Sequence, residues 1–388
     1  MTKLIRVFCV AGVFLPGFRG GGPIRTLTNM RDQLSKWIEL SIFTRDRDLG
    51  EKIPYENISI DQWSFVEGYR VYYASPRFFG IKGAKKATSE YQFDILYLNS
   101  FFDFHGSIQI YFLFRKIEPN IPIILAPRGE FSPGALSIKW LKKKIFLSSV
   151  KLFGFYKDIR WHASTEQEAQ DILKQFPNAL NRIYIAKDPV AINDKSITRE
   201  IKKETGQLRM IFLSRISPMK NLDGLLNILK IVKATITLSI YGPIEDNAYW
   251  EKCKKLISTL PKNIKATYCG IAEPNKVFAT FASYDLFAFP THGENFGHVI
   301  IESLRSGTPI LLSDKTSFHA DELHAITVIP ANDQKTWADA IEKAAARNQK
   351  QQSQLREAAL NYFKKYLEIS DSIDSNLAMF RSAISQSQ

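Results

Sequence analysis

Residues 285–314, DLFAFPTHGENFGHVIIESLRSGTPILLSD, decide the fold that we expect for this chain. The apolar run Leu286–Phe289 has the length of a buried strand, and a polar, Gly-bearing loop at 290–295 follows it. The next residues, about 296–305, have the apolar spacing of a helix, which a Gly and a Pro end before a second apolar run begins. A strand, a loop, a helix and a strand in this order are typical of a parallel α/β sheet.

Two carboxylates lie in this stretch, Glu294 in the loop and Glu302 on the expected helix. Loops at the carboxyl ends of parallel strands are where α/β proteins bind ligands. The backbone N–H groups of residues 295–299 are expected to open the helix, which suits an anion such as a diphosphate. Because a carboxylate repels that anion, Glu294 suits the neutral hydroxyls of a sugar or ribose. The spacing E-x7-E alone also fits an ordinary helix with one acid at its first turn and one on a solvated face.

The whole stretch resembles the E-x7-E segment of retaining glycosyltransferases of the two-domain GT-B fold, specifically glycosyltransferase family 4. The resemblance rests on GENFG at 293–297, ES at 302–303 and SGTP at 306–309. It implies a catalytic position for Glu294 and a donor-binding set made of Asn295, Phe296, Gly297, His298, Val299 and Glu302.

A second motif lies earlier, where Arg215 and Lys220 are five positions apart in a loop after an expected strand at 209–213. Two cations at the carboxyl end of a strand can clamp a diphosphate, Arg through its planar fork and Lys as a point charge. Alone, the pair also fits a basic loop without a role. Beside E-x7-E it resembles the R-x4-K of family 4, which implies catalytic roles for both residues. The resemblance also implies that the nucleobase lies against backbone at a position like Ile271.

The first strand, about residues 4–14, leads into a loop with three consecutive glycines before a helix. Such a loop lets backbone approach a ligand and leaves N–H groups available, although a tight turn explains it as well and it is no G-x-G-x-x-G fingerprint. The resemblance implies that Gly21 and Gly22 face the donor phosphates and the acceptor. Arg25, in the first helical turn, is then placed to reach the same anion.

The strand at 123–126 ends in Pro127-Arg128-Gly129. Many members of the family have Pro-His-Gly here, with the histidine near the anomeric carbon of the sugar, so Arg128 stands in the place of that histidine. This departure puts a histidine role in doubt, and the guanidinium is instead suited to phosphate or acceptor hydroxyls.

With 388 residues, the chain has about twice the length of a typical domain, so we expect two domains. The resemblance implies an α/β GT-B architecture, two Rossmann-like parallel-sheet domains facing across a cleft. Residues 1–190 are the expected N-terminal acceptor-side domain, with a C-terminal crossing helix at about 370–388. Residues 191–369 are the expected C-terminal domain that binds the nucleotide-sugar donor, and the polar stretch 191–206 has the composition of a linker.

The formal net charge is +13, and residues 1–190, with 27 Lys+Arg against 18 Asp+Glu, carry +9 of it. A basic half suits nucleic acid, an acidic substrate or an anionic membrane surface. Residues 137–157, SIKWLKKKIFLSSVKLFGFYK, combine a helical period with six lysines. Such a helix can lie on an anionic bilayer or be an ordinary outer helix with a solvated basic face. The resemblance favours the membrane, because many relatives glycosylate lipid-linked acceptors.

Several other classes of site are not supported by the sequence. The three cysteines lack the spacing of metal ligands and suit a reducing compartment. Asp46-x-Asp48 superficially matches the metal-binding D-x-D of the GT-A architecture, but each Asp has an adjacent Arg, so we expect a charged strand exit. The apolar run after Arg6 has nine residues and no small-x-small cleavage site, so a buried first strand explains it better than a signal peptide. No run of about 18 apolar residues predicts a membrane span.

Together with these observations, the resemblance implies a metal-independent, retaining glycosyltransferase of the hexosyltransferase type. It implies no cofactor, because the nucleotide-sugar is a substrate. We expect a glycan or lipid-linked acceptor, a role in cell-surface polysaccharide or lipopolysaccharide biosynthesis, and no nucleic-acid partner. The expected location is cytoplasmic and peripheral on the inner face of the cell membrane.

Three other functions remain to be compared with this one. A glycoside hydrolase using Glu294 and Glu302 would leave Arg215 and Lys220 without an anion. A nucleotide-sugar epimerase on the same fold would need no acceptor. A non-catalytic membrane or nucleic-acid adaptor does not need both motif pairs intact.

Overall fold

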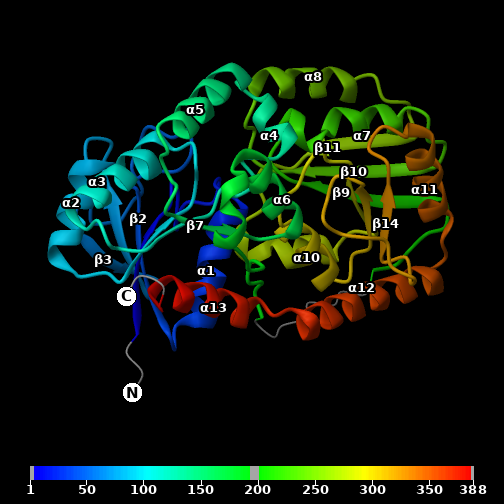
Figure 1. Ribbon diagram of the computed structural model, residues 1–388. Coiled ribbons are helices and arrows are strands. Elements are labelled where there is room, and N and C mark those ends of the chain that lie inside the picture. Colours follow the sequence, from blue (N-terminus) through cyan, green and yellow to red (C-terminus); the bar gives the residue numbers. More distant parts are fainter. Residues whose placement is uncertain (1–3, 193–200, 386–388) are drawn as a thin grey trace. The chain divides into compact units, whose positions relative to one another are not determined.

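The computed structural model describes residues 4–192 and 201–385, which form two compact α/β units (Figure 1). Unit 1 consists of Met1–Ala191 with Asp371–Gln388, and unit 2 consists of Ile192–Ser370. The C-terminal helix α13 therefore belongs to unit 1, although all of unit 2 precedes it in the sequence. Half of the linker expected at 191–206, residues 193–200, lies outside the described residues.

Unit 1 is built on an eight-stranded sheet with the strand order β3-β4-β2-β1-β5-β6-β7-β8. All neighbours pair in parallel except β3 and β4, which are antiparallel. The strands are β1 (Ile5–Val10), β2 (Ile38–Arg45), β3 (Trp63–Val66), β4 (Tyr69–Ala74), β5 (Ile95–Leu98), β6 (Ile123–Leu125), β7 (Arg160–Ala163) and β8 (Ile183–Ile185).

The central strands of unit 1 are apolar on both faces, as expected for a sheet covered by helices on each side. One core contains Phe101, Phe114 and Trp161. The other contains Leu27 of α1 and Phe380 of α13. The helical segments are α1 (Gly22–Leu34), α2 (Ile81–Glu90), η1 (Phe104–Ile108), α3 (Gln109–Ile117), α4 (Pro133–Ser137), α5 (Trp140–Leu152), α6 (Glu166–Gln175), η2 (Pro177–Arg182) and α13 (Ser372–Ser385).

Unit 2 has a six-stranded, all-parallel sheet with the strand order β11-β10-β9-β12-β13-β14. From β9, the strands β10 and β11 extend to one side and β12, β13 and β14 to the other, which is the order of the doubly wound Rossmann sheet. The strands are β9 (Gln207–Leu213), β10 (Thr235–Tyr241), β11 (Ile264–Tyr268), β12 (Leu286–Phe289), β13 (Ile310–Ser313) and β14 (Ile326–Ile329).

The helices of unit 2 bury apolar faces against this sheet. Trp337 of α11 packs in one core with Leu225 of α7 and Met210 of β9. The helical segments are η3 (Pro218–Lys220), α7 (Leu222–Leu229), α8 (Asn247–Ile257), η4 (Pro274–Lys276), α9 (Val277–Ala282), α10 (His298–Arg305), α11 (Gln334–Ala346) and α12 (Gln349–Ile369). The expectation of two parallel-sheet α/β domains is therefore confirmed.

Two helix boundaries differ from the sequence prediction. The helix expected at about 296 begins at His298, because Gly297 has a left-handed φ of 83° and forms the N-cap. The helix expected over 137–157 is α5, which is shorter at both ends: it begins at Trp140, after Lys139 with a left-handed φ of 54°, and ends at Leu152. Within the described ranges, no helix has the length and apolar character needed to cross a bilayer.

Candidate functional site

The candidate site lies in unit 2 where the strand order reverses, between β9 and β12. In doubly wound sheets, ligands bind at the carboxyl ends of the strands at this switch point. The loop 214–221 leaves β9 and the loop 290–297 leaves β12, so the fold brings the R-x4-K and E-x7-E motifs to the same place.

Hydrogen bonds fasten these two loops to each other. The side-chain amide of Asn221 donates to the carbonyl of Pro290 at 2.8 Å, and the backbone N–H of His292 donates to the carbonyl of Met219 at 2.8 Å. The buried hydroxyl of Thr291 lies 2.8 Å from Gly293 O and 3.0 Å from Met219 O, and it donates to one of them at a time. These bonds fix the relative position of the two motifs.

Lys220 and Glu294 meet at the centre of the two loops. Lys220 Nζ lies 2.9 Å from Glu294 Oε2 and 3.2 Å from the carbonyl oxygen of Gly293. The Lys220 side chain is only 7% exposed and that of Glu294 19%, so water screens this ion pair weakly. The same ammonium lies 5.5 Å from the ring centre of Phe289.

The electrostatics of the site keep Glu294 ionised. Burial raises the pKa of its carboxyl, but the charge and hydrogen bond of Lys220 and the charge of Arg215 lower it more. The backbone N–H of Asn295 also donates to Glu294 Oε1, at 3.1 Å. The pKa of Glu294 therefore lies below its usual value, and its oxygens accept hydrogen bonds at neutral pH.

Arg215 is held by a third loop. Its Nη1 donates to Glu245 Oε1 at 2.9 Å, and both side chains are well exposed, at 42% and 39%. Glu245 follows β10, whose loop is tied to the loop after β9 by the bonds Ile216 N to Pro243 O and Glu245 N to Ile216 O. Gly242 permits this approach, because a Cβ there would lie 1.8 Å from Ser214 O.

The remaining predicted donor-binding residues of the E-x7-E motif lie in α10 and in the loop directly before it. Of the five backbone groups expected to open the helix, only those of His298 and Val299 are in it; Asn295, Phe296 and Gly297 remain in the loop. The rings of Phe296 and His298 are 4.7 Å apart. Glu302, also in α10, is largely buried.

Ile271 lies in the turn after β11, at the same carboxyl edge of the sheet but two strands away from β9. Its side chain is partly exposed. The neighbouring Gly270 accepts a hydrogen bond from the N–H of Gly242 at 2.9 Å, so the turns after β10 and β11 are joined as well.

In unit 1, Gly21, Gly22 and Arg25 lie together at the start of α1, in the connection from β1 to α1. Gly21 is the N-cap with a left-handed φ of 64°, and a Cβ there would meet no atom within 4 Å, so open space faces this position. Arg25 follows in the first turn of the helix and is half-buried.

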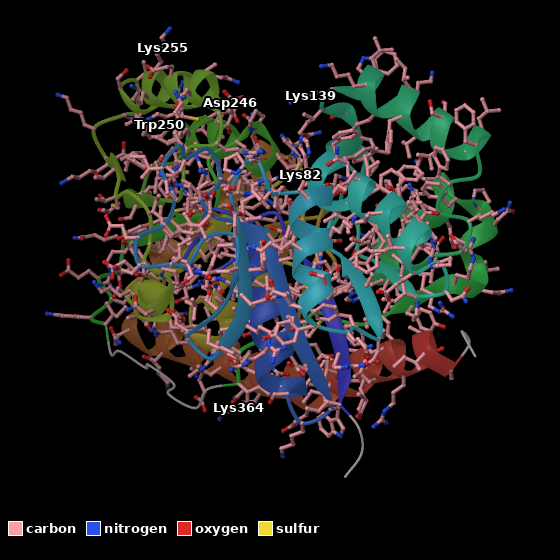
Figure 2. All side chains as sticks on the ribbon, turned by 90° about the vertical axis from the view of Figure 1, so that its left-hand side faces the viewer. Lys82, Lys139, Asp246, Trp250, Lys255 and Lys364 are labelled. Atoms are coloured by element: carbon pink, nitrogen blue, oxygen red, sulfur yellow. The ribbon has the colours of Figure 1, made fainter. Side chains whose placement is uncertain are left out.

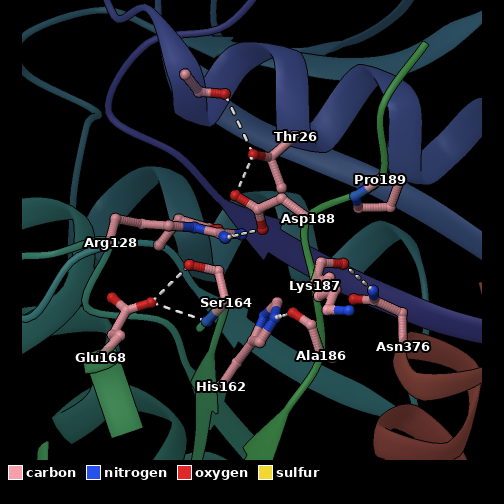
Figure 3. A network of polar contacts seen from close by, with 12 residues as sticks. Thr26, Arg128, His162, Ser164, Glu168, Ala186, Lys187, Asp188, Pro189 and Asn376 are labelled. Atoms are coloured by element: carbon pink, nitrogen blue, oxygen red, sulfur yellow. Dashed lines mark hydrogen bonds and ion pairs between the residues drawn. The ribbon is translucent and has the colours of Figure 1, made fainter. Parts of the chain in front are cut away.

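Arg128 lies in a closed internal network rather than in an open loop (Figure 3). Its Nη1 donates to Asp188 Oδ1 at 2.7 Å, its Nη2 to the hydroxyl of Tyr97 at 2.7 Å and to Asn99 Oδ1 at 2.8 Å, and its Nε to Asn99 Oδ1 at 3.1 Å. Asp188 in turn accepts a hydrogen bond from Thr26 at 2.7 Å. Four of the five guanidinium N–H groups are thus used within the chain, which gives Arg128 a structural role that the sequence did not predict.

The network continues through Tyr97 to His162. The hydroxyl of Tyr97 lies 2.6 Å from His162 Nδ1, and His162 Nε2 lies 2.8 Å from the carbonyl oxygen of Ala186. Since a carbonyl can only accept, Nε2 carries the proton and Nδ1 accepts from Tyr97. Burial, together with the charge of Arg128, lowers the pKa of His162 to about 4, so the ring is neutral near pH 7.

Sequence reasoning missed three residues that shape the site, Asn221, Glu245 and Thr291. Asn221 has a left-handed φ of 57°, a conformation that Asn adopts more readily than most residues. The signal in the sequence was therefore an Asn directly before the expected helix. Thr291 is one of several polar residues in the loop 290–295, and Glu245 follows the Gly242-Pro243 turn. Neither residue has a sequence pattern that predicts its contact.

Asp46 and Asp48 are engaged with nearby groups. Asp46 pairs with Arg47 at 2.7 Å, and Asp48 accepts from the backbone N–H groups of Phe18 and Leu49. Across the described part of the chain, no three His, Cys, Asp or Glu residues are grouped as a metal site would require.

Part of the chain matches a known protein family. Residues 193–362, which are less than half of the chain, match the family Glycosyl transferases group 1. Over 197 residues, 47% of the chain, it is 24% identical to a D-inositol 3-phosphate glycosyltransferase of Nocardia farcinica, and the alignment spans only 44% of that relative. It is also 24% identical to an uncharacterized 41.2 kDa protein in the cps region of Klebsiella pneumoniae, covering 75% of this chain and 79% of the relative.

The solved structures extend the similarity to the whole chain. Anabaena HepE, crystallised with UDP and glucose, superposes with a TM-score of 0.70 at 14% identity, covering 98% of this chain and 100% of HepE. The chain therefore has the GT-B fold of glycosyltransferases.

Proposed function

We propose that the protein is a retaining glycosyltransferase that moves a hexose from a nucleotide-sugar donor to a glycan or lipid-linked acceptor. The observation that carries the proposal is the convergence of Lys220, Arg215 and Glu294 at the switch point of unit 2. The matched family and the UDP-bound structure of HepE support a nucleotide-sugar donor. We assign the protein to glycosyltransferase family 4 on its two motif pairs.

The chemistry follows from where charge develops. When the bond between the anomeric carbon and the phosphate oxygen breaks, its electron pair goes to the diphosphate. Lys220 and Arg215 supply positive charge there, and the first turn of α10 adds the positive end of its dipole. The acceptor oxygen bonds to the same face of the anomeric carbon, and its proton passes to the leaving diphosphate. Because these two cations can supply the charge that a metal would otherwise supply, we propose a reaction without metal or other cofactor.

The carboxylates have a different task. Glu294 is ionised and fixed by Lys220 and Asn295, so it suits acceptance of hydrogen bonds from donor-sugar hydroxyls. We assign Glu302 to the ribose hydroxyls, the loop 295–297 and Ile271 to the rest of the donor, and Gly21, Gly22 and Arg25 to its phosphates and the acceptor. An epimerase on this fold would act on the nucleotide-sugar without an acceptor, which separates the two activities.

A thermal-shift and transfer experiment tests the proposal. We expect one of UDP-, GDP- or ADP-glucose to stabilise the protein in the presence of EDTA, by about 2.7 kcal/mol at a hundredfold excess over Kd. We expect Arg215→Ala and Lys220→Ala to remove the shift. The linkage formed on a suitable acceptor, read by the anomeric proton coupling, should keep the configuration of the donor. Turnover of donor to a free epimer without acceptor, or an inverted linkage, would contradict the proposal.

We also propose that unit 1 binds the inner face of an anionic membrane through the surface of the segment 138–153. Six large apolar side chains here are more than half exposed, among them Trp140, Ile145 and Phe153. Five exposed lysines lie among or beside them, and residues 131–157 contain no Asp or Glu (Figure 2 labels Lys139, directly before α5). Apolar side chains that enter the interface and lysines that meet anionic headgroups are the two features of a peripheral helix. This surface supports a cytoplasmic, membrane-peripheral enzyme of polysaccharide or lipopolysaccharide biosynthesis.

Vesicle sedimentation tests this surface. We expect binding to vesicles of phosphatidylglycerol and phosphatidylcholine, weak binding to phosphatidylcholine alone, and loss of binding in Lys142→Glu/Lys144→Glu. The matched control is Lys82→Glu/Lys85→Glu, which changes the charge of unit 1 equally on exposed lysines of α2. Equal losses of vesicle binding in the two double variants would indicate only a general effect of charge and would contradict the proposed surface.

A further inference from the structure

Arg215 has a long, rotatable side chain that a single carboxylate holds in place. Its Nη1 donates to Glu245 Oε1 at 2.9 Å. Within residues 4–192 and 201–385, the Arg215 side chain makes no other hydrogen bond or ion pair. Fixing an arginine side chain costs conformational entropy, so a partner that holds it before a ligand arrives lowers the cost of binding.

The backbone that carries this carboxylate is itself fixed. Ile216 follows Arg215 directly, and its N–H donates to the carbonyl of Pro243 at 2.8 Å. The carbonyl of Ile216 accepts from the N–H of Glu245 at 3.2 Å and from that of Asp246 at 3.4 Å. Asp246 is the N-cap of α8, and its side chain accepts a backbone N–H of that helix. Glu245 therefore stands on a rigid turn between β10 and α8.

The contact with Glu245 uses only one side of the Arg215 guanidinium. Nη1 is engaged, whereas Nε–H and Nη2–H, which form one fork of the planar group, have no partner in the described ranges. Two N–H groups in such a fork match two oxygens of a phosphate. The charge of Arg215 also contributes to the lowered pKa of Glu294, so the guanidinium acts on the centre of the site.

Neither the charge nor the stability of this ion pair explains Glu245. A carboxylate beside the diphosphate would repel it, so the charge of Glu245 opposes anion binding. The Arg215 and Glu245 side chains are 42% and 39% exposed, and an ion pair this exposed adds little to stability. What the contact does provide is a fixed direction for the guanidinium.

We propose that Glu245 is a positioning residue: it holds Arg215 by Nη1 and thereby presents the Nε–Nη2 fork to two phosphate oxygens. This role rests on the proposed function, so the diphosphate is that of the nucleotide-sugar and of the nucleotide released. Negative charge increases on the diphosphate as the bond to the sugar breaks. A correctly oriented fork therefore stabilises the transition state more than the bound donor.

Two neutral replacements separate orientation from charge. Glu245→Gln keeps an oxygen that accepts from Nη1, Glu245→Ala removes it, and both remove the negative charge. Titration calorimetry with UDP, GDP and ADP in EDTA measures binding. For the nucleotide that wild type binds, we expect Glu245→Gln to bind at least as tightly as wild type and Glu245→Ala to bind about tenfold more weakly than Glu245→Gln.

Two further variants test whether Glu245 acts through Arg215. In an Arg215→Lys background, which keeps the charge but has no fork, Glu245→Gln and Glu245→Ala should bind the nucleotide equally. Glu251→Ala is the control, since Glu251 pairs with Lys254 on the exposed surface of α8, and it should bind as wild type does.

Transfer kinetics give an independent readout. We expect Glu245→Ala to lower kcat about tenfold with a smaller change in the KM of the donor, because the fork acts mainly on charge that develops during the reaction. Glu245→Gln should restore kcat. The midpoints of urea unfolding of both variants should match that of wild type, which separates positioning from a general loss of structure.

The contrary outcomes distinguish this role from the proposed function. Equal nucleotide binding by Glu245→Gln and Glu245→Ala would overturn the positioning role, and so would a difference that persists in the Arg215→Lys background. Absence of nucleotide binding by wild type would overturn both the positioning role and the donor site. A difference that depends on Arg215, without transfer of sugar to any acceptor, would reject the proposed function alone.

Discussion

The ammonium group of Lys220 and the carboxylate of Glu294 form a 2.9 Å ion pair, although the two residues are 74 positions apart in the sequence. They meet because β9 and β12 are neighbours at the centre of the sheet, where each strand begins one half of the doubly wound order. The pair thus joins the two motifs into one site, with Lys220 available to an anion and Glu294 to neutral hydroxyls.

Replacing Lys220 with Ala is expected to lower kcat by about 10²–10³, the usual cost of removing one group that stabilises developing negative charge. Steady-state kinetics with the nucleotide-sugar that stabilises the protein measure this loss. Lys254→Ala is the control, since Lys254 pairs with Glu251 on the exposed surface of α8. Similar kinetics for the two variants would remove Lys220 from the catalytic set.

Glu294 is expected to make stability depend on pH in the acidic range. Its pKa is lowered in the folded protein, so its contribution is fully present above its usual value of 4.5 and is lost as pH falls below that value. Urea unfolding of wild type and Glu294→Gln at several pH values between about 3 and 7 isolates this contribution. The difference in free energy of unfolding between them should shrink with acid, and a constant difference would contradict the assignment.

Arg128→Ala is expected to destabilise the protein by about 3–5 kcal/mol, because it leaves Asp188 as an uncompensated buried charge. The midpoint of urea denaturation gives the value. Lys276→Ala breaks an exposed pair with Glu273 and should cost at most about 1 kcal/mol. An equally small effect at Arg128 would place its guanidinium outside the network of Figure 3.

His162 is expected to remain neutral down to about pH 4 in the folded protein. The unfolded chain takes up a proton at this residue below about pH 6.5, so folding loses stability between pH 6.5 and 4, by about 3 kcal/mol in total. An NMR titration of the ring nitrogens gives the pKa directly, and His162→Gln should unfold with less dependence on pH in this interval. A His162 pKa near 6.5 would show that the ring is not buried as described.

The sequence predicted the parallel sheets and both motif pairs because these depend on local patterns. Apolar runs such as Leu286–Phe289 identify buried strands, and Arg215, Lys220 and Glu294 lie directly after strands, so their place at the carboxyl edge of a parallel sheet follows from topology. The start of α10 was misplaced by two residues, because the left-handed conformation of Gly297 is a property of the folded loop.

The role of Arg128 required the folded structure. Its partners Tyr97, Asn99 and Asp188 come from 29 to 60 positions away, and no local pattern predicts such a set. The pairing of Arg215 with Glu245 is of the same kind, since it depends on the alignment of the loops after β9 and β10.

The assignment of α13 to unit 1 has a consequence for synthesis on the ribosome. Leu377, Met379 and Phe380 belong to the same core as Leu27 of α1, so that core is incomplete until the chain beyond residue 371 has been made. Unit 2, which ends at Ser370, can fold first although it comes second. In the order of synthesis, the core that joins α1 to α13 is therefore the last part of unit 1 to be completed.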